Sequence, residues 1–470
     1  MILYRIYDLM NRRNLIKAMA TGFPAWYIAP WVLAACSKKD DEDASNFKGS
    51  VCIVGAGAAG IYAAAYLIER GIDVTILEAS AVAGGRIRSA QGFADFPIEL
   101  GAEEIHGRRS LLYDLALAMA PDAILPEPGA SKYWLNGALR DHYYFTESPA
   151  LQGAGAILLQ ITESFASYGG PDISLQEYLL NFPVDNSLLD IANALIANEY
   201  GTQLDRIGMH ALREAEQLYS SGIDGYFLKN QSLWSLFEKA FPEALAKIQF
   251  NKNVTEINYA GDNLIVKTSD GIEYTSEKIL LTVPISILQQ DLIAFSPAIP
   301  PQKQTAINAI KMDSGSKFVL RFSAPFWAED TGSILGGTKI PEYWVASAGK
   351  NSTTPILTAF VMGERAAYFH GMNETQIQTE LLAELSLMYP TQNPTALCTG
   401  IVIQRWADEP FIRGAYSYPS PESTGMREVL AEPLANKLYF AGEACNVNGH
   451  IATVNGAMES AYLACKSIIS

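Results

Sequence analysis

The first clear pattern along the chain is a short apolar, β-branched run at residues 51–54, which leads directly into a turn of small residues. An alanine-rich stretch of helical character follows to about Arg70, and Gly71 is typical of a helix end. A second apolar run at 73–77 then ends in Glu78. The order strand, glycine-rich turn, helix and strand predicts a βαβ unit.

Strand-like runs recur further along the chain. Residues 264–266 and 279–281 are apolar and β-branched, and the turn-forming pair 270–271 separates them. Residues 296–394 alternate strand-like runs with helical ones. The chain therefore predicts an α/β fold that continues to its C-terminal part.

Residues 316–322 show a period of two. The alternation places Phe318, Leu320 and Phe322 on one face of a strand and Lys317 on the other. From this pattern alone, Lys317 is predicted to be an exposed lysine on a strand.

The N-terminal residues have the layout of a secretory signal. No charged residue occurs at 18–37, and a positive cluster at 12–17 precedes this apolar stretch. Pro24 and Pro30 would interrupt a membrane-spanning helix, so a retained membrane anchor is the alternative rather than the first interpretation.

Two short resemblances make the export prediction more specific. Residues 11–17 resemble a twin-arginine signal, although Asn11 stands where Ser or Thr is usual. The four residues that end at Cys36 resemble a bacterial lipobox, in which this cysteine is acylated. We expect a signal peptide at 1–35, a flexible tether at 36–49 and a protein of the periplasm or cell envelope, held at the membrane by a lipid on Cys36.

Composition and charge exclude several classes. The chain of 470 residues is 49% hydrophobic, which allows two or three domains with substantial cores and argues against disorder. Its net charge is −16, and the part beyond the signal carries −19, without a dense basic patch. A nucleic-acid partner is therefore not expected. The five cysteines include no Cys-x-x-Cys pair and the five histidines are scattered, so no metal site is predicted.

The small-residue turn has the spacing of a dinucleotide-binding fingerprint. Gly55 permits a tight turn, Gly57 lets a pyrophosphate approach the backbone, and Gly60 lets the helix pack against the strand. Glu78 at the end of the second strand is placed to bind a ribose diol, which disfavours NADP. The turn is expected to bind the cofactor through five residues: Gly55, Ala56, Gly57, Ala59 and Gly60.

This fingerprint does not distinguish NAD from FAD, but the following residues do. The segment 84–86, Gly-Gly-Arg, resembles the second phosphate contact of FAD-binding amine oxidases. Further blocks are similar to the flavin-containing amine oxidase family, in family order, over roughly residues 49–470: 99–107, 253–257, 278–284, 316–322, 405–418, 438–444 and 452–457. The region 125–230 is the least similar.

The resemblance implies bound FAD. Ala415 stands where monoamine oxidases attach FAD through a cysteine, so noncovalent FAD is expected. Val254 would meet the adenine through its backbone, and Glu443 would contact the ribityl or pyrophosphate region. The remaining cofactor contacts implied by the resemblance are Gly85, Arg86, Gly101, Ala102, Glu103, Pro284, Trp406, Gly442, Thr453, Val454 and Ala457.

The resemblance also implies the chemistry, which is hydride transfer from the carbon beside an amine nitrogen to flavin N5. Lys317 would hold a water at N5, and Tyr416 would stand over the flavin face. Thr453 replaces a second tyrosine of monoamine oxidases, which implies a roomier site. His106 resembles a pocket histidine of polyamine oxidases. Glu104 stands where L-amino-acid oxidases offer an arginine, which favours a cationic amine. Residue type alone also allows a core tyrosine at 416 and a structural histidine at 106.

The family architecture is a doubly wound, Rossmann-like FAD-binding domain interlaced with an α+β substrate domain. The expected FAD segments are 50–120, 230–290 and 400–470, and the expected substrate segments are 121–229 and 291–399.

The sequence thus predicts an FAD-dependent amine oxidase that uses oxygen or another electron acceptor. Reoxidation by oxygen would give hydrogen peroxide, and the imine product would hydrolyse. Two alternatives stay open. One is an L-amino-acid oxidase or a related flavin dehydrogenase, and the other is a surface lipoprotein that binds FAD without catalysis.

Overall fold

The computed structural model describes residues 47–141, 164–222 and 224–470. The expected signal peptide, the twin-arginine motif, Cys36 and almost all of the expected tether lie outside these residues. Within the described ranges, no helix is both long and apolar enough to cross a membrane.

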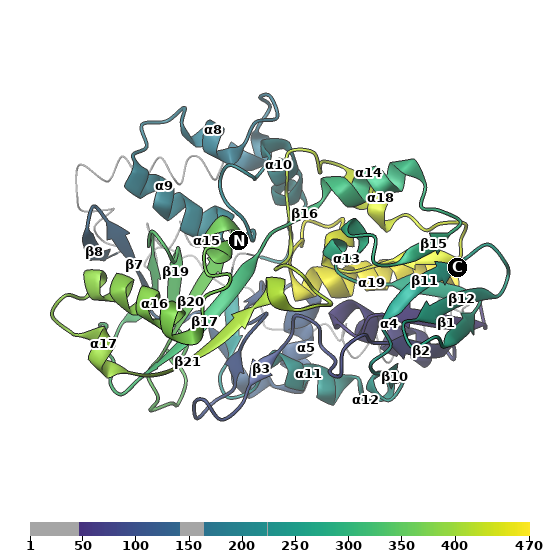
Figure 1. Ribbon diagram of the computed structural model, residues 1–470, viewed down its shortest axis with the longest axis horizontal. Coiled ribbons are helices and arrows are strands. Elements are labelled where there is room, and N and C mark those ends of the chain that lie inside the picture. Colours follow the sequence, from purple (N-terminus) through teal and green to yellow (C-terminus); the bar gives the residue numbers. More distant parts are fainter. Residues whose placement is uncertain (1–46, 142–163, 223) are drawn as a thin grey trace, which may run out of the picture.

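A five-stranded parallel sheet forms the centre of one half of the molecule, on the right of Figure 1. Its strands come from three separated parts of the chain, and their short apolar runs are buried on both faces. In spatial order they are β10 (Ile248–Gln249), β2 (Asp73–Leu77), β1 (Ser50–Val54), β14 (Lys278–Leu281) and β23 (Leu438–Phe440).

Both faces of this sheet are covered, by different layers. Val51 and Ile53 belong to a core shared with two helices, α4 (Ala58–Glu69) and α19 (Val454–Ile469). The alternate residues of β1 belong to a second core, under a four-stranded sheet. The strands of that sheet are β13 (Glu273–Ser276), β12 (Leu264–Thr268), β11 (Val254–Asn258) and β15 (Ala294–Ser296).

The predicted βαβ unit is confirmed. Helix α4 ends at its C-cap Arg70, and Gly71 has a φ of +75°, a conformation that glycine adopts without strain. Strands β1 and β2 pair in parallel over their whole length.

A seven-stranded mixed sheet dominates the other half, on the left of Figure 1. Phe318 and Leu320 on one face pack against α16 (Glu374–Met388). In spatial order the strands are β21 (Cys398–Arg405), β17 (Gly315–Phe322), β20 (Ile356–Met362), β19 (Glu342–Val345), β18 (Thr331–Leu335), β7 (Ala130–Leu135) and β8 (Ala138–Asp141).

The prediction of an exposed Lys317 from its strand pattern is wrong. The alternation itself holds, but the face of β17 that carries Lys317 is also covered, because Val319 packs there against Phe96 and Ile98. The Lys317 side chain is 4% exposed.

Shorter elements complete the described part. A three-stranded sheet lies in the order β5 (Ile105–His106), β9 (Gly225–Leu228), β6 (Ile124–Pro126). A separate helical core includes α8 (Leu175–Leu179), α9 (Asn186–Ala192) and α10 (Met209–Leu218). The bounds of the other elements are β3 (Ser89–Ala90), β4 (Ile98–Glu99), α5 (Leu111–Met119), α11 (Leu233–Ala240), α12 (Pro242–Leu245), α13 (Ile285–Gln289), α14 (Pro301–Ala309), β16 (Lys311–Met312), α15 (Gly363–Ala367), α17 (Pro394–Leu397), β22 (Ser417–Tyr418) and α18 (Met426–Ala431).

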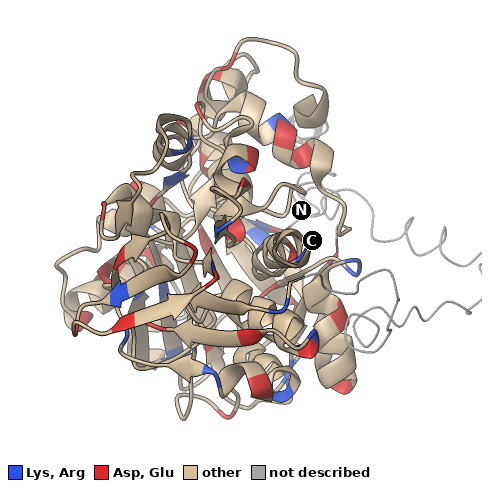
Figure 2. Cartoon of the chain, turned by 90° about the vertical axis from the view of Figure 1, so that its right-hand side faces the viewer, with Lys and Arg blue, Asp and Glu red and all other residues tan. Residues whose placement is uncertain are grey.

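The predicted α/β class is confirmed, with a Rossmann-like sheet beside a mixed sheet. The division of the chain into domains stays a prediction, and residue 400, the expected start of the last FAD segment, lies inside β21. Acidic and basic positions are interspersed over the described chain, as Figure 2 shows.

Candidate active site

A large cavity lies between the glycine-rich turn and the seven-stranded sheet. It encloses about 850 Å³, which is within the usual range for a site that binds a small molecule or cofactor. All but two of the predicted site residues line it; the exceptions are Ala56 and Gly60. Residues from all three expected FAD segments and from the mixed sheet therefore meet in one place.

The glycine-rich turn forms one end of this cavity. Gly55 has a φ of +106°, and a Cβ on Gly60 would lie only 2.0 Å from the Gly55 carbonyl oxygen. Gly57 differs, because a Cβ there would meet no protein atom within 4 Å and would occupy the cavity. Gly55 and Gly60 thus serve the fold, whereas Gly57 leaves space for a ligand.

Glu78 lies where the sequence predicted it, at the end of β2 and on the cavity wall. One carboxylate oxygen accepts a hydrogen bond from the Ala56 amide at 2.8 Å, and the other accepts one from the Ser80 amide at 2.9 Å. Ala56 does not line the cavity, but its amide holds the Glu78 carboxylate in place. A carboxylate has about four acceptor positions, so Glu78 keeps capacity for a ribose diol.

Arg86 and Glu443 form an ion pair at 3.0 Å on the cavity wall. The Arg86 guanidinium also donates to the Ala415 carbonyl at 2.8 Å. Glu443 is 5% exposed and accepts further bonds from the Ser417 hydroxyl and the Ala452 amide. Glu443 therefore holds Arg86, a cavity-lining cation suited to a phosphate, in a fixed position.

The segment at Gly101 packs closely against the backbone of Arg86 and the ring of Trp406, which requires a glycine at this position. A Cβ on Gly101 would lie 1.8 Å from the Arg86 carbonyl oxygen and 2.9 Å from the Trp406 ring. The Ala102 amide donates to the same carbonyl, and the Trp406 indole donates to the Leu100 carbonyl at 3.1 Å. Gly101 and Trp406 lock this segment beside Arg86.

The N-terminus of α19 forms another part of the wall. Thr453 is its N-cap: the hydroxyl accepts from the Gly456 amide at 2.8 Å and donates to the His450 carbonyl at 2.8 Å. Its neighbours Val454 and Ala457 line the cavity too. The Thr453 hydroxyl is thus already engaged in capping, and a role toward substrate stays a prediction.

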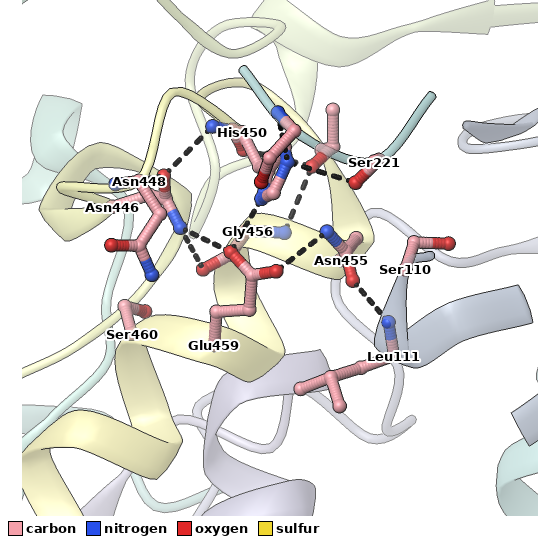
Figure 3. Close-up of polar contacts among 12 residues, drawn as sticks. Ser110, Leu111, Ser221, Asn446, Asn448, His450, Asn455, Gly456, Glu459 and Ser460 are labelled. Carbon is pink, nitrogen blue, oxygen red and sulfur yellow. Dashed lines mark hydrogen bonds and ion pairs between the residues drawn. The ribbon is translucent and has the colours of Figure 1, made fainter. Parts of the chain in front are cut away.

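A buried polar network holds the loop before α19. Glu459 is surrounded by His450, Asn446 and Asn455 (Figure 3). Its carboxylate lies 2.6 Å from His450 Nδ1 and accepts hydrogen bonds from the amide groups of Asn446 and Asn455, both at 3.0 Å. His450 also contacts the Ser221 hydroxyl at 2.8 Å. The order serine, histidine, glutamate resembles a nucleophilic triad, but Ser221 is 1% exposed and lies off the cavity, so the network serves to position the loop.

Lys317 reaches the cavity from β17 and pairs with Glu103. The ammonium lies 2.8 Å from the Glu103 carboxylate and 3.4 Å from the Glu99 carbonyl oxygen, to both of which it donates. It also lies over the Trp344 ring, 4.8 Å from the ring centroid. Glu103, predicted as a cofactor contact, is therefore first of all the counter-ion of Lys317.

Glu99 lies behind this pair. One oxygen of its carboxyl group accepts from the Leu233 amide at 2.6 Å, at the start of α11. Burial raises the pKa of Glu99 to about 8. The hydrogen bond from the Leu233 amide lowers this pKa, and the nearby charge of Glu103 raises it further.

His106 and Tyr416 also line the cavity. The His106 imidazole contacts the Glu104 carboxylate at 3.2 Å, and both side chains are 18% exposed. Burial opposes the charged imidazolium, but Glu104 outweighs it and raises the pKa of His106 above its ordinary value. The Tyr416 hydroxyl donates to the Glu199 carbonyl at 3.0 Å.

Several wall residues were not predicted from the sequence. Glu127 lies beside Glu104, because a Cβ on Gly225 would be 2.5 Å from a Glu104 oxygen and 3.5 Å from a Glu127 oxygen. The other unpredicted wall residues with polar or aromatic side chains include Glu199, Glu342, Trp344 and Lys350. Glu127 and Glu199 lie in the least family-like region, Glu342 and Trp344 lie on β19, and Lys350 lies in the turn between β19 and β20, where no short motif marks them.

The wall residues fit FAD on structural grounds. The open space at Gly57, the remaining acceptors of Glu78 and the Arg86 cation match a pyrophosphate and a ribose. Val254, at the start of β11, and Pro284, the N-cap of α13, line the same end, and Gly85 and Gly442 complete it.

Solved structures share this fold. Cyclohexylamine oxidase from Brevibacterium oxydans IH-35A superposes with a TM-score of 0.78 at 17% identity, over 90% of this chain and 99% of that structure. Wild-type putrescine oxidase bound to putrescine gives a TM-score of 0.76 at 18% identity and the same coverage.

Curated relatives differ in length. Lysine-specific histone demethylase 1 homolog 2 of Arabidopsis thaliana is 30% identical over 87% of this chain and 57% of its own length. Lysine-specific histone demethylase 1B of Mus musculus is 26% identical over 84% and 50%. The chain thus spans about half the length of these demethylases, whereas polyamine oxidase 4 of Oryza sativa subsp. japonica, at 25% identity, is covered over 87%.

The sequence profile described as "Flavin containing amine oxidoreductase" matches residues 58–469, which is most of the chain. On this match, together with the shared fold and the wall residues that fit a flavin nucleotide, the protein belongs to the flavin-containing amine oxidoreductase family.

Proposed function

We propose that this protein oxidises a cationic amine with noncovalently bound FAD and passes the electrons to oxygen, giving hydrogen peroxide and an imine that hydrolyses. The observation that carries the proposal is the large cavity. One end has the glycine-rich turn and Glu78, and the other end has Lys317, Tyr416 and a group of glutamates. When bound, FAD supplies the acceptor for the hydride.

Noncovalent binding is supported by the residues around the cavity. Ala415 offers no side chain for attachment, and none of the four cysteines in the described ranges lines the cavity: Cys52, Cys398, Cys445 and Cys465.

The charges of the substrate-side wall favour a cation. Glu104 and Glu127 lie beside the same glycine, and Glu342 adds a carboxyl group that is 1% exposed. Carboxylates of low exposure attract an ammonium ion more strongly than exposed ones, because the local dielectric is lower.

The amine must lose a proton before its hydride leaves, and this wall offers an acceptor. His106 beside Glu104 can take that proton, because the carboxylate stabilises the imidazolium. Tyr416, held by the Glu199 carbonyl, would limit how the amine carbon enters. The Lys317 ammonium lines the same cavity and keeps one N–H that could donate a hydrogen bond where reduction of oxygen develops negative charge.

One observation favours a second candidate, an L-amino-acid oxidase. Lys350 lines the cavity, and burial lowers the pKa of its ammonium group. An ammonium in this position could bind a substrate carboxylate. Glu104, in the place of the arginine of L-amino-acid oxidases, argues against this candidate.

An anaerobic panel of amines and amino acids, read by bleaching of the bound flavin, separates the candidates. We expect mono- or diamines to bleach the flavin and amino acids of similar size to be slower. Bleaching by amino acids alone would favour the second candidate, and flavin that no compound reduces would favour a non-catalytic FAD-binding protein.

We also propose export and lipid anchoring through Cys36, on the N-terminal sequence pattern alone. Labelling cells with a lipid precursor should mark the wild-type protein and not the Cys36→Ala variant. Equal labelling of both would refute the anchor.

A further inference from the structure

We propose that Glu103 is a charge-compensating residue, which cancels the Lys317 ammonium so that the cavity can contain this lysine and still admit a cationic amine. The proposal rests on the proposed function and deepens it, because it names a residue that sets which charges the site accepts.

The contact between the two side chains is short and shielded from water. The Lys317 ammonium and the Glu103 carboxylate are 2.8 Å apart, and the side chains are 4% and 10% exposed. A second hydrogen bond to the Glu99 carbonyl and the Trp344 ring fix the ammonium from two other directions. Lys317 therefore remains beside Glu103 and cannot turn to solvent.

Glu103 is the carboxylate that forms an ion pair with the Lys317 ammonium. Glu99 is the nearest alternative, but its pKa of about 8 keeps most of it protonated and uncharged at neutral pH. Lys350 lines the same cavity, close enough to interact electrostatically with Glu103, Glu99 and Lys317. Without Glu103, the Lys317 and Lys350 ammonium groups would remain, and Lys317 would lose the carboxylate that it contacts at 2.8 Å.

An uncompensated ammonium would repel the substrate. Two like charges roughly 8 Å apart in a partly buried site weaken binding by about tenfold. An enzyme that needs both a lysine and a cationic substrate must neutralise the lysine, and the Glu103 carboxylate does so at the position of Lys317 itself.

The test is a double-mutant cycle on the FAD-loaded protein, with binding of the unreactive cation butyltrimethylammonium read from the flavin absorbance. Glu103→Gln should weaken binding of this cation about tenfold and leave binding of neutral 1-butanol unchanged. Adding Lys317→Met should restore cation binding to within about threefold of wild type. If Glu103 only stabilised the local structure, adding Lys317→Met would not restore cation binding.

Glu104→Gln is the matched control, since it removes the same charge one residue away but next to His106. Its effect on cation binding should persist when Lys317→Met is added. If Lys317→Met fails to restore binding in the Glu103→Gln protein, or if Glu103→Gln leaves binding unchanged, the proposal is overturned.

A second readout needs no amine. The midpoint potential of the bound flavin should become more positive in Glu103→Gln and return toward wild type in the double variant, because an uncompensated positive charge favours the reduced flavin. If Glu103→Gln does not retain FAD, Glu103→Asp should shift both readouts in the same direction by a smaller amount. A wild-type protein that no amine reduces would count against the proposed function, whereas the potentials would still decide the role of Glu103.

Discussion

At the scale of single residues, Lys317 shows how the protein keeps a charge in a nearly dry wall. An ammonium that is 4% exposed is stable there because Glu103 and the Glu99 carbonyl accept its hydrogen bonds. Removing one partner of such a pair leaves the other charge buried and unpaired. The same contacts make Lys317 informative to mutate.

Lys317→Met should slow reoxidation of the reduced flavin by oxygen by about 10²-fold, while FAD remains bound. It should also destabilise the protein by about 3 kcal/mol, because Glu103 loses its partner. Stopped-flow reoxidation and thermal melting measure the two effects. Lys350→Met is the control, since Lys350 has no comparable bond to Glu103 in the described structure, and equal slowing in both variants would contradict the assignment.

His106 predicts a pH dependence. Its pKa is raised above the ordinary value by Glu104, so lowering the pH charges the imidazole and adds a positive charge to the substrate side. kcat/KM for a cationic amine should fall by about tenfold as the pH drops through this pKa. The His106→Gln variant should not show this fall of kcat/KM at low pH. The same fall in both proteins would contradict the prediction.

How far the sequence predicts single residues depends on what each residue does. Gly57 and Glu78 lie where the motif implies, because their spacing is set by the local βαβ geometry. The partners of Lys317 could not be predicted, because Glu103 and Glu99 lie more than 200 residues away and reach it only through packing between distant segments. Glu342 and Lys350 belong to no motif and are recognised only by their place on the cavity wall.

At the scale of elements, two glycines of the turn between β1 and α4 have different purposes: Gly60 is required for packing of the fold, and Gly57 leaves space for a ligand. A Cβ on Gly60 collides with backbone, whereas a Cβ on Gly57 meets only the cavity. The apolar runs of β1 and β2 were readable from the sequence because they are local. The second covered face of β17 was not, since it is formed by residues 93–100.

Two alanine substitutions test this difference. Gly60→Ala should destabilise the FAD-free protein by about 2 kcal/mol or more, because backbone has to move. Gly57→Ala should leave the melting temperature of the FAD-free protein nearly unchanged but weaken FAD binding at least about tenfold. Equal effects of the two substitutions on the FAD-free protein would contradict this account of the turn.

At the scale of the whole molecule, residues of two sheets line the large cavity, and an acidic group buried at their junction links global stability to pH. Glu99 lies at this junction. Its side chain accepts a hydrogen bond from the Leu233 amide, and its backbone carbonyl accepts one from the Lys317 ammonium. Its carboxyl group stays protonated in the folded protein up to a pKa of about 8, mainly through burial. In the unfolded chain it ionises near its ordinary value of 4.5.

Between these two pKa values the folded state holds a proton that the unfolded state has lost, so the contribution of Glu99 to stability falls as pH rises through this window. Melting temperatures of wild type and Glu99→Gln between pH 5 and roughly 8 should show a steeper decline for wild type. Parallel curves would contradict the assigned environment of Glu99.

The central claim is that an amine delivers its electrons to a flavin held in this cavity. The most direct measurement is an anaerobic titration of the purified, FAD-loaded protein with an amine that is active in the panel, followed by addition of oxygen. We predict that the flavin is fully bleached by a stoichiometric amount of amine, and that oxygen restores its absorbance with the formation of an equal amount of hydrogen peroxide. Flavin that stays oxidised in the presence of every amine tested would contradict the account.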